Sequence, residues 1–341
     1  GRLRFGSDFE FVLTQSGSQN VDFLGLSDLL EKGDLEAEPT VMILAPEPGS
    51  QVLIGNADQQ NGKVSIAGRI RAHTAINVLG GVDSGKLELH ETGQLETIDG
   101  SINYQVGSGF ELKGSLIAGG AESDVVLSTT GKLDIKGNIT AQDEIRLLSN
   151  GSKLSAQLSI ETHNTSRLVA GRRIEIEGLN DVLINSKIEA IGEGLLELSS
   201  RNGRLVVSEN SGSIKTPGRV QMGGREVEFH GLLEADGSAH PVGADFSFNL
   251  ENPYERENQA YVPDFDAYLI SIGASESVTI TGDLESKGSI LLAAGTGVEL
   301  HGATIKATGD DSRVDVFSDK EVGLGRAAIS GAVLVEIGGV V

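Results

Sequence analysis

The segments VSIA at residues 64–67, LELH at 87–90, FELK at 110–113 and LDIK at 133–136 follow one another at intervals of 23 residues. In each segment a polar residue separates two apolar ones, as in a β-strand that buries one face. A fixed period of about 20–50 residues indicates a solenoid. A strand that returns at this interval predicts an all-β fold, a parallel β-helix with stacked coils of about 20–26 residues.

The repeat continues beyond residue 136 after one change of phase. A weaker coil lies near Ala156 and Leu158, and the first strand of a coil is then expected at Val182, Leu205, Val227, Val278, Val298 and Val322. A second strand follows about 12–16 residues later in most coils, and Gly or Ser, then an apolar residue and Ala, forms the corner between them. We therefore predict a solenoid over residues 61–341, with residues 1–60 as an irregular region that leads into it.

The repeat is interrupted most strongly at residues 238–268. The coil that starts at Val227 reaches its second strand only at Leu269 to Ile272, so the insertion replaces a corner between two strands. It is acidic and holds six of the chain's fourteen aromatic residues: Phe246, Phe248, Tyr254, Tyr261, Phe265 and Tyr268. Exposed aromatic rings stack on sugars or anchor a protein partner, so these six are the candidate binding residues. The alternative is that they fold back and pack on the flank of the solenoid.

Composition narrows the functional classes. The formal net charge is -22, which argues against nucleic acid or an anionic membrane as a partner and suits a soluble β-structure. No apolar run approaches the roughly 20 residues needed to span a bilayer, so membrane insertion is not expected. The chain has no cysteine, which excludes disulfides, thiolate metal sites and a cysteine nucleophile. We expect no cofactor from this composition.

Catalytic and metal motifs are weak. The best local pair of carboxylates for glycoside hydrolysis is Asp310 and Asp311, but an Asp-rich turn explains the same residues. Asp319 lies nearby in the sequence, and these three residues come nearest to a cluster of ligands for Ca²⁺. The six histidines show no H-x-x-x-H or H-E-x-x-H spacing, so a zinc protease is unsupported. We assign no catalytic residue from sequence.

Charged residues recur at outward positions of the coils. Ser65, Glu88, Glu111 and Asp134 are expected to stack in one row, with Lys63, Lys86 and Lys132 in a row beside it. Adjacent rows of opposite charge offset the repulsion within each row. We interpret both as features of a solvated surface in which each exposed pair contributes little to stability.

Residues 278–307 read VTITGDLESKGSILLAAGTGVELHGATIKA. In this stretch Gly288, Ile290, Leu292 and Ala294 are followed by Val298, Leu300, Gly302, Ile305 and Ala307. The pattern resembles the repeats of filamentous-haemagglutinin-type proteins, GxIxLxA followed by VxLxGxxIxA. The resemblance implies a right-handed parallel β-helix, secretion across the bacterial outer membrane, and roles in adhesion, biofilm formation or contact-dependent toxin delivery.

These observations predict a structural or adhesive segment of a large secreted or cell-surface bacterial protein. In this interpretation a rigid β-helical stalk presents loops, and the partner is a cell-surface glycan or protein, or further coils of the same polypeptide or filament. One alternative is a polysaccharide lyase or hydrolase on the same fold. Another is an extracellular filament subunit that assembles through its ends. The apolar residues 333–341 resemble the middle of a coil, so we expect a piece of a longer polypeptide.

Overall fold

The structure of the chain is a computed structural model. The structure describes residues 2–5, 10–12, 20–22, 34–37, 42–45, 48–54, 63–79, 86–106, 109–150, 158–209, 213–237, 268–310, 312–331 and 334–340. These residues form a parallel β-solenoid with coils of about 23 residues, which confirms the predicted fold class. The right-handed coil that the resemblance implies stays a prediction. The chain divides into two units, Gly1–Ile176 and Glu177–Val341.

The first unit is built from short strands, three to each coil. In chain order they are β1 (Arg2–Phe5), β2 (Glu10–Val12), β3 (Asn20–Asp22), β4 (Asp34–Ala37), β5 (Met42–Ala45), β6 (Gln51–Ile54), β7 (Lys63–Ile66), β8 (Arg69–Ala72), β9 (Ala75–Leu79), β10 (Lys86–Leu89), β11 (Gln94–Thr97), β12 (Ser101–Val106), β13 (Gly109–Leu112), β14 (Ser115–Ala118), β15 (Val125–Thr129), β16 (Lys132–Ile135), β17 (Asn138–Ala141), β18 (Glu144–Ser149), β19 (Ile160–Thr162), β20 (Arg167–Ala170) and β21 (Arg173–Gly178).

The second unit has the same plan with some longer strands. They are β22 (Val182–Ile184), β23 (Lys187–Ala190), β24 (Leu195–Ser200), β25 (Arg204–Val207), β26 (Ser213–Thr216), β27 (Arg219–Phe229), β28 (Leu232–Ala235), β29 (Ile270–Ile280), β30 (Asp283–Ser286), β31 (Ile290–Ala294), β32 (Gly297–Leu300), β33 (Thr304–Ala307), β34 (Arg313–Gly323), β35 (Ala328–Ser330) and β36 (Leu334–Val340). A long strand such as β27 ends one coil and begins the next, because its first half pairs with β24 and its second half with β25.

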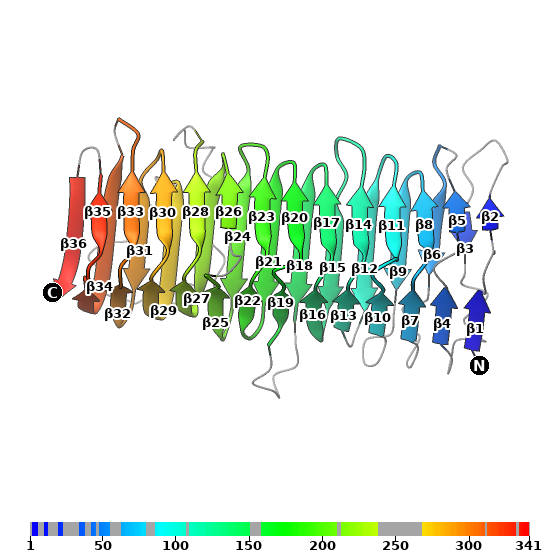
Figure 1. Cartoon of the computed structure of the whole chain (residues 1–341), viewed down its shortest axis with the longest axis horizontal. Coiled ribbons are helices and arrows are strands. Elements are labelled where there is room, and N and C mark those ends of the chain that lie inside the picture. The colour runs from blue at the N-terminus through cyan, green and yellow to red at the C-terminus, as the bar shows by residue number, and fades with distance from the viewer. Residues whose placement is uncertain are drawn as a thin grey trace, which may run out of the picture. The chain divides into compact units, whose positions relative to one another are not determined.

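Strand pairing follows the repeat read from the sequence. In the first unit β7, β10, β13 and β16 lie side by side in parallel, so that Val64, Leu87, Phe110 and Leu133 are successive partners (Figure 1). In the second unit the six predicted strand starts are also successive partners: Val182, Leu205, Val227, Val278, Val298 and Val322. The period therefore predicted the register as well as the architecture.

Each coil has one strand more than the sequence suggested. The pattern of Gly, an apolar residue and Ala was interpreted as a corner, but in the third coil it belongs to strand β8, in which Ile70 and Ala72 are buried. Such strands form their own parallel sheet, β2-β5-β8-β11-β14-β17-β20 in the first unit. Alternate residues of a four-residue strand suffice to bury one face, so a short stretch that resembles a corner still pairs as a strand.

The described strands before residue 60 also belong to coils. Leu3 pairs with Leu35, and Leu35 pairs with Val64. These offsets of 32 and 29 residues differ from 23, and for that reason the sequence suggested an irregular region there. Within the residues described, the solenoid begins at β1 rather than at residue 61.

The weaker coil is shifted from its predicted place. Its first strand is β19, where Ile160 pairs with Leu133. The prediction placed this coil near Ala156 and Leu158, but Leu158 precedes the strand and Ala156 lies outside the described residues. The offset from Leu133 to Ile160 is 27 residues, so extrapolation of the 23-residue period placed the strand too early.

The strands that flank the predicted 238–268 insertion are β27 and β28 before it and β29 after it. Val220 and Met222 of β27 pair with Ile270 and Ile272 of β29, and Val227 pairs with Val278. The second strand of this coil is thus the first half of β29, and the next coil begins in the second half of β29, as predicted. Residues 238–267 lie outside the described part of the chain, and Tyr268 is the member of the insertion that the structure describes.

The interior consists of stacked aliphatic residues, each contributing about 1.5–3 kcal/mol when fully buried. Tyr104 is one of the largest fully buried side chains and carries a polar group. It is 2% exposed, its hydroxyl accepts a hydrogen bond from the backbone N–H of Leu87 at 2.9 Å, and it donates to the Gly109 carbonyl at 3.2 Å. Coils approach closely at their corners, since a Cβ on Gly137 would lie 1.8 Å from the carbonyl oxygen of Gly114. Such contacts explain the glycines at the corners of the repeat.

No helix capable of crossing a membrane occurs within the part of the chain that the structure describes.

Candidate functional site

An acidic row runs over the outward side of the first unit. Ser65, Glu88, Glu111, Asp134 and Glu161 are successive partners on β7, β10, β13, β16 and β19. The first four were predicted to stack in this way. Lys63, Lys86 and Lys132 occupy the predicted second row, with Gly109 between the last two. Since the pairing register fixes the backbone, side chains in one row have nearest neighbours one coil away.

A basic row lies two residues after the acidic one. It contains His90, Lys113, Lys136 and His163. Lys136 bridges two carboxylates of the acidic row, with its Nζ 3.0 Å from Glu111 Oε1 and 2.8 Å from Asp134 Oδ2. His90 instead faces a hydroxyl, with Nε2 2.7 Å from Ser65 Oγ. Lys136 thus neutralises part of the charge of the acidic row, whereas His90 pairs with an uncharged side chain.

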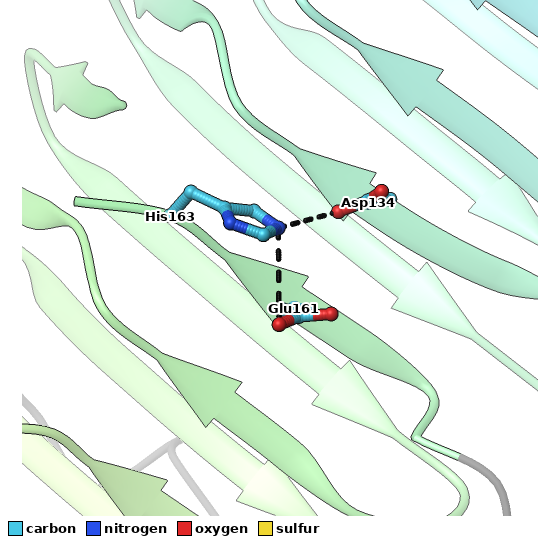
Figure 2. Close-up of side chains that lie close together, drawn as sticks. All are labelled: Asp134, Glu161 and His163. Carbon is cyan, nitrogen blue, oxygen red and sulfur yellow. Dashed lines mark hydrogen bonds and ion pairs between the residues drawn. The ribbon is translucent and has the colours of Figure 1, made fainter. Parts of the chain in front are cut away.

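Asp134, Glu161 and His163 form the candidate site. Among the described residues they are the group of three whose ligand-type atoms all lie within 4.8 Å of one another. His163 Nε2 is 2.7 Å from Asp134 Oδ1 and 3.8 Å from Glu161 Oε1 (Figure 2). The side chains are 19%, 21% and 29% exposed for Asp134, Glu161 and His163, so the site is accessible but partly shielded.

Two lysines hold the remaining carboxylate oxygens. Lys136 contacts Asp134 Oδ2, whereas His163 faces Oδ1 of the same carboxylate. Lys132 contacts Glu161 Oε2, whereas His163 faces Oε1. Each carboxylate therefore has one oxygen fixed by an ammonium group and one turned toward the imidazole.

The ionisation of these carboxylates follows from their contacts. Burial alone would raise the pKa of Asp134, but hydrogen bonds from Lys136 and His163 outweigh burial and lower that pKa. For Glu111 burial again opposes the shift, and hydrogen bonds from Lys136 and Lys113 lower the pKa to about 2. Asp134 and Glu111 are consequently anionic at neutral pH and unsuited to donate a proton there.

A second group of carboxylates surrounds Arg172. The guanidinium binds Asp143 through Nε and Nη2 at 2.7 and 3.1 Å, and it also reaches Glu144 Oε1 at 2.6 Å. Burial, and then the nearby charges of Glu144 and Asp143, raise the pKa of Asp124. A raised carboxyl pKa is one mark of an acid catalyst, but Asp124 Oδ1 accepts the backbone N–H of Glu144 at 3.1 Å. That hydrogen bond connects Asp124 to the backbone at the start of β18, which is a structural role.

The predicted aromatic site falls largely outside the described residues, which exclude Phe246, Phe248, Tyr254, Tyr261 and Phe265. Tyr268 is described and is 2% exposed. Its hydroxyl donates to Asp315 Oδ2 and accepts from Arg313 Nη2 at 2.6 Å. Arg313 Nε also lies 2.7 Å from Asp315 Oδ2. Burial and then the hydrogen bond to Asp315 raise the pKa of Tyr268 above its usual value.

The predicted Ca²⁺ residues are not brought together by what the structure describes. Asp310 is exposed in a turn after β33, Asp311 lies outside the described residues, and only the backbone of Asp319 is described. The acidic pair Asp310 and Asp311 consequently stays a sequence-based candidate for catalysis or Ca²⁺ binding.

Sequence reasoning missed Glu161, His163, Arg313 and Asp315. The first two belong to the coil whose strand was placed too early. The repeat carries the signal that could have found them: if Ile160 is taken as the partner of Leu133, Glu161 falls beside Asp134 and His163 follows Lys136 in the basic row. No local motif marks the burial of Asp315.

Comparison with known proteins gave no match to a family model, a curated protein or a solved structure.

Proposed function

We propose that this chain is a structural and adhesive segment of a large secreted or cell-surface bacterial protein. In this proposal a β-solenoid stalk carries the 238–268 segment and presents it to a cell-surface glycan or protein. The observation that carries the proposal is the contrast between a regular scaffold with mutually paired outward charges and a single long insertion anchored to it.

The outward rows support a scaffold role. Glu111, Asp134 and Glu161 are each paired with a lysine of their own surface. Exposed ion pairs add little stability, but they keep a long β-surface charged and solvated, which discourages association along its sides. This is the surface expected of a spacer.

The anchoring of Tyr268 supports a presenting role. This residue ends the insertion, and its ring and hydroxyl are held by Arg313 and Asp315 of β34. Binding residues are often found on loops whose ends are fixed by a rigid scaffold. The contacts at Tyr268 fix one end of the aromatic segment in this way.

The carboxylates favour this proposal over the hydrolase alternative. Glycoside hydrolysis needs an acid with a raised pKa and a second carboxylate facing it across the substrate. The pKa of Asp134 is lowered, and Asp124, whose pKa is raised, is engaged by the backbone of Glu144.

The test is binding of the purified chain to a glycan panel and to bacterial and host cells, with and without residues 238–267. A short Gly-Ser linker would join β28 to Tyr268 in the deleted form, and a chain lacking residues 151–157 serves as the matched control. We expect binding that is lost in the first deletion and kept in the second, with the β-type circular dichroism unchanged in both. If neither the full chain nor the control binds, the adhesive function is wrong and a spacer or filament subunit is favoured. Sedimentation at several concentrations then separates these two, because a filament subunit polymerises.

A further inference from the structure

We propose that Asp134, Glu161 and His163 bind one first-row transition-metal dication of the Zn²⁺ type on the outward face of the first unit. The inference is independent of the proposed function, since it rests on residues far from the 238–268 segment in the sequence.

The site lies where the basic row has a histidine, instead of a lysine, beside two neighbouring carboxylates of the acidic row. Adjacent like charges in a ladder repel one another. Between Glu111 and Asp134 the ammonium group of Lys136 bridges the two carboxylates. Between Asp134 and Glu161 the same place in the basic row is taken by His163, whose imidazole can bind a metal through a ring nitrogen. A dication bound by the imidazole would bridge the carboxylates of Asp134 and Glu161, as Lys136 bridges those of Glu111 and Asp134.

The donor atoms suit such an ion. His163 Nε2 lies 2.7 Å from Asp134 Oδ1 and 3.8 Å from Glu161 Oε1, and the three ligand-type atoms lie within 4.8 Å of one another. Ligands about 2.0–2.2 Å from a Zn²⁺ ion are themselves roughly 3–4 Å apart in tetrahedral geometry. Small side-chain movements place the ion among the three atoms, and water from the solvent side supplies the fourth ligand.

The lysines act as orienting groups. They occupy Asp134 Oδ2 and Glu161 Oε2, so they hold the carboxylates without covering the oxygens that face His163. Hydrogen bonds to the outer atoms of metal ligands commonly fix ligand orientation in this way. Figure 2 shows the imidazole of His163 directed at both carboxylates from one side.

The same lysines determine which ions fit. Two carboxylates and two ammonium groups leave the cluster without net charge when His163 is neutral. Ca²⁺ and Mg²⁺ depend on several anionic oxygen ligands, whereas Zn²⁺ and Co²⁺ gain from an imidazole nitrogen. The site should therefore prefer the transition metals.

Metal binding also determines which ring nitrogen of His163 carries the hydrogen. In the metal-free site the hydrogen on Nε2 points to Asp134 Oδ1. On binding, Nε2 gives its lone pair to the metal and the ring hydrogen resides on Nδ1, through exchange with water. An imidazolium must release one proton before its nitrogen can bind a metal, so acid should compete with the metal.

The experiment is calorimetric titration of the whole chain, freed of metal by chelator, with ZnCl₂ and separately with CoCl₂. We expect one ion per chain, visible Co²⁺ absorption bands and a perturbed imidazole resonance of His163. His163→Ala should lower the affinity by about tenfold or more. His90→Ala is the matched control, because His90 occupies the same row but faces Ser65, and it should leave binding unchanged.

A second variant separates metal binding from folding. His163→Lys places an ammonium group beside the two carboxylates, like Lys136, so the variant should fold normally and bind no metal at this site. A titration in which wild type and His163→Lys take up Zn²⁺ equally would overturn the proposal. So would a His163 imidazole that titrates with pH and is unaffected by Zn²⁺ or Co²⁺.

Discussion

Two outward rows, one in each unit, have opposite environments although the residues of both rows lie between core residues of their strands. In the first unit Asp134 is 19% exposed and its charge is met by neighbours in adjacent rows. In the second unit Gln221, Ser271, Leu291 and Asp315 are successive partners on β27, β29, β31 and β34, and they are 4%, 2%, 0% and 1% exposed. The alternation of a strand thus determines which way a side chain points, whereas exposure depends on what covers that side.

The difference in exposure changes how much an ion pair contributes to stability. An exposed pair such as that of Lys215 and Glu234, with side chains 62% and 38% exposed, is screened by water. Asp315 is buried, and its Oδ1 has no hydrogen-bond partner among the described residues, so its charge depends on contacts made by Oδ2. Removing one partner of a buried charge is far more harmful than removing one from the surface.

The largest effect should come from Arg313→Ala. The change leaves the buried Asp315 carboxylate with the Tyr268 hydroxyl and without its cation. Because the Arg313 side chain is itself 39% exposed, we expect a loss of about 2–3 kcal/mol in the free energy of unfolding, measured in urea. Lys215→Ala is the control and should change it by less than about 1 kcal/mol. Equal losses of unfolding free energy in the two variants would show that the buried Asp315 pair is no more important for stability than an exposed pair.

A neutral substitution tests the burial itself. Leu291 of β31 and Val126 of β15 each lie between two core residues of their strand, but Leu291 is buried and Val126 is only half-buried. Leu291→Gln forces an amide into a covered place and should lower the free energy of unfolding by about 2 kcal/mol. Val126→Gln should stay within about 0.5 kcal/mol of wild type. Similar losses at both positions would mean that the two faces are equally covered.

The same contrast explains how much of the fold was predictable. Strand register depends on apolar spacing, so Val64, Leu87, Phe110 and Leu133 could be aligned from sequence alone. Where the spacing changes, as between Leu133 and Ile160, the strand was misplaced. Strands such as β8 were mistaken for corners because four residues carry little alternation.

The candidate site was predictable only in part, for related reasons. The row through Glu111 and Asp134 followed from the period, but Glu161 and His163 join it through a coil of different length. Nothing local in the sequence around Asp315 indicates that an outward carboxylate is buried beside Tyr268, since the two residues are 47 positions apart. Long-range contacts of this kind require the coil register before they can be inferred.

The smallest expected effect concerns pH and the acidic row. Glu111 has a folded pKa of about 2 against an ordinary value of 4.5. The unfolded chain therefore takes up a proton first as the pH falls, so the stabilisation by Lys136 and Lys113 is complete above about pH 4.5 and lost toward pH 2. Glu111→Gln should remove about 1 kcal/mol of the decline in unfolding free energy between pH 5 and pH 2, after allowance for solvent screening.

Glu91→Gln is the matched change at an exposed carboxyl in the turn after β10. It should leave the pH dependence as in wild type, because screening by water weakens any interaction of an exposed charge. If Glu111→Gln and Glu91→Gln have the same pH profile, the lysine bridges of the row do not stabilise the folded chain. If the unfolding free energy depends less on pH in Glu111→Gln alone, the partly shielded carboxylate of Glu111 stabilises the folded chain more than an exposed carboxylate does. The covered row around Asp315 would then be the extreme of a graded effect of burial, rather than a different kind of interaction.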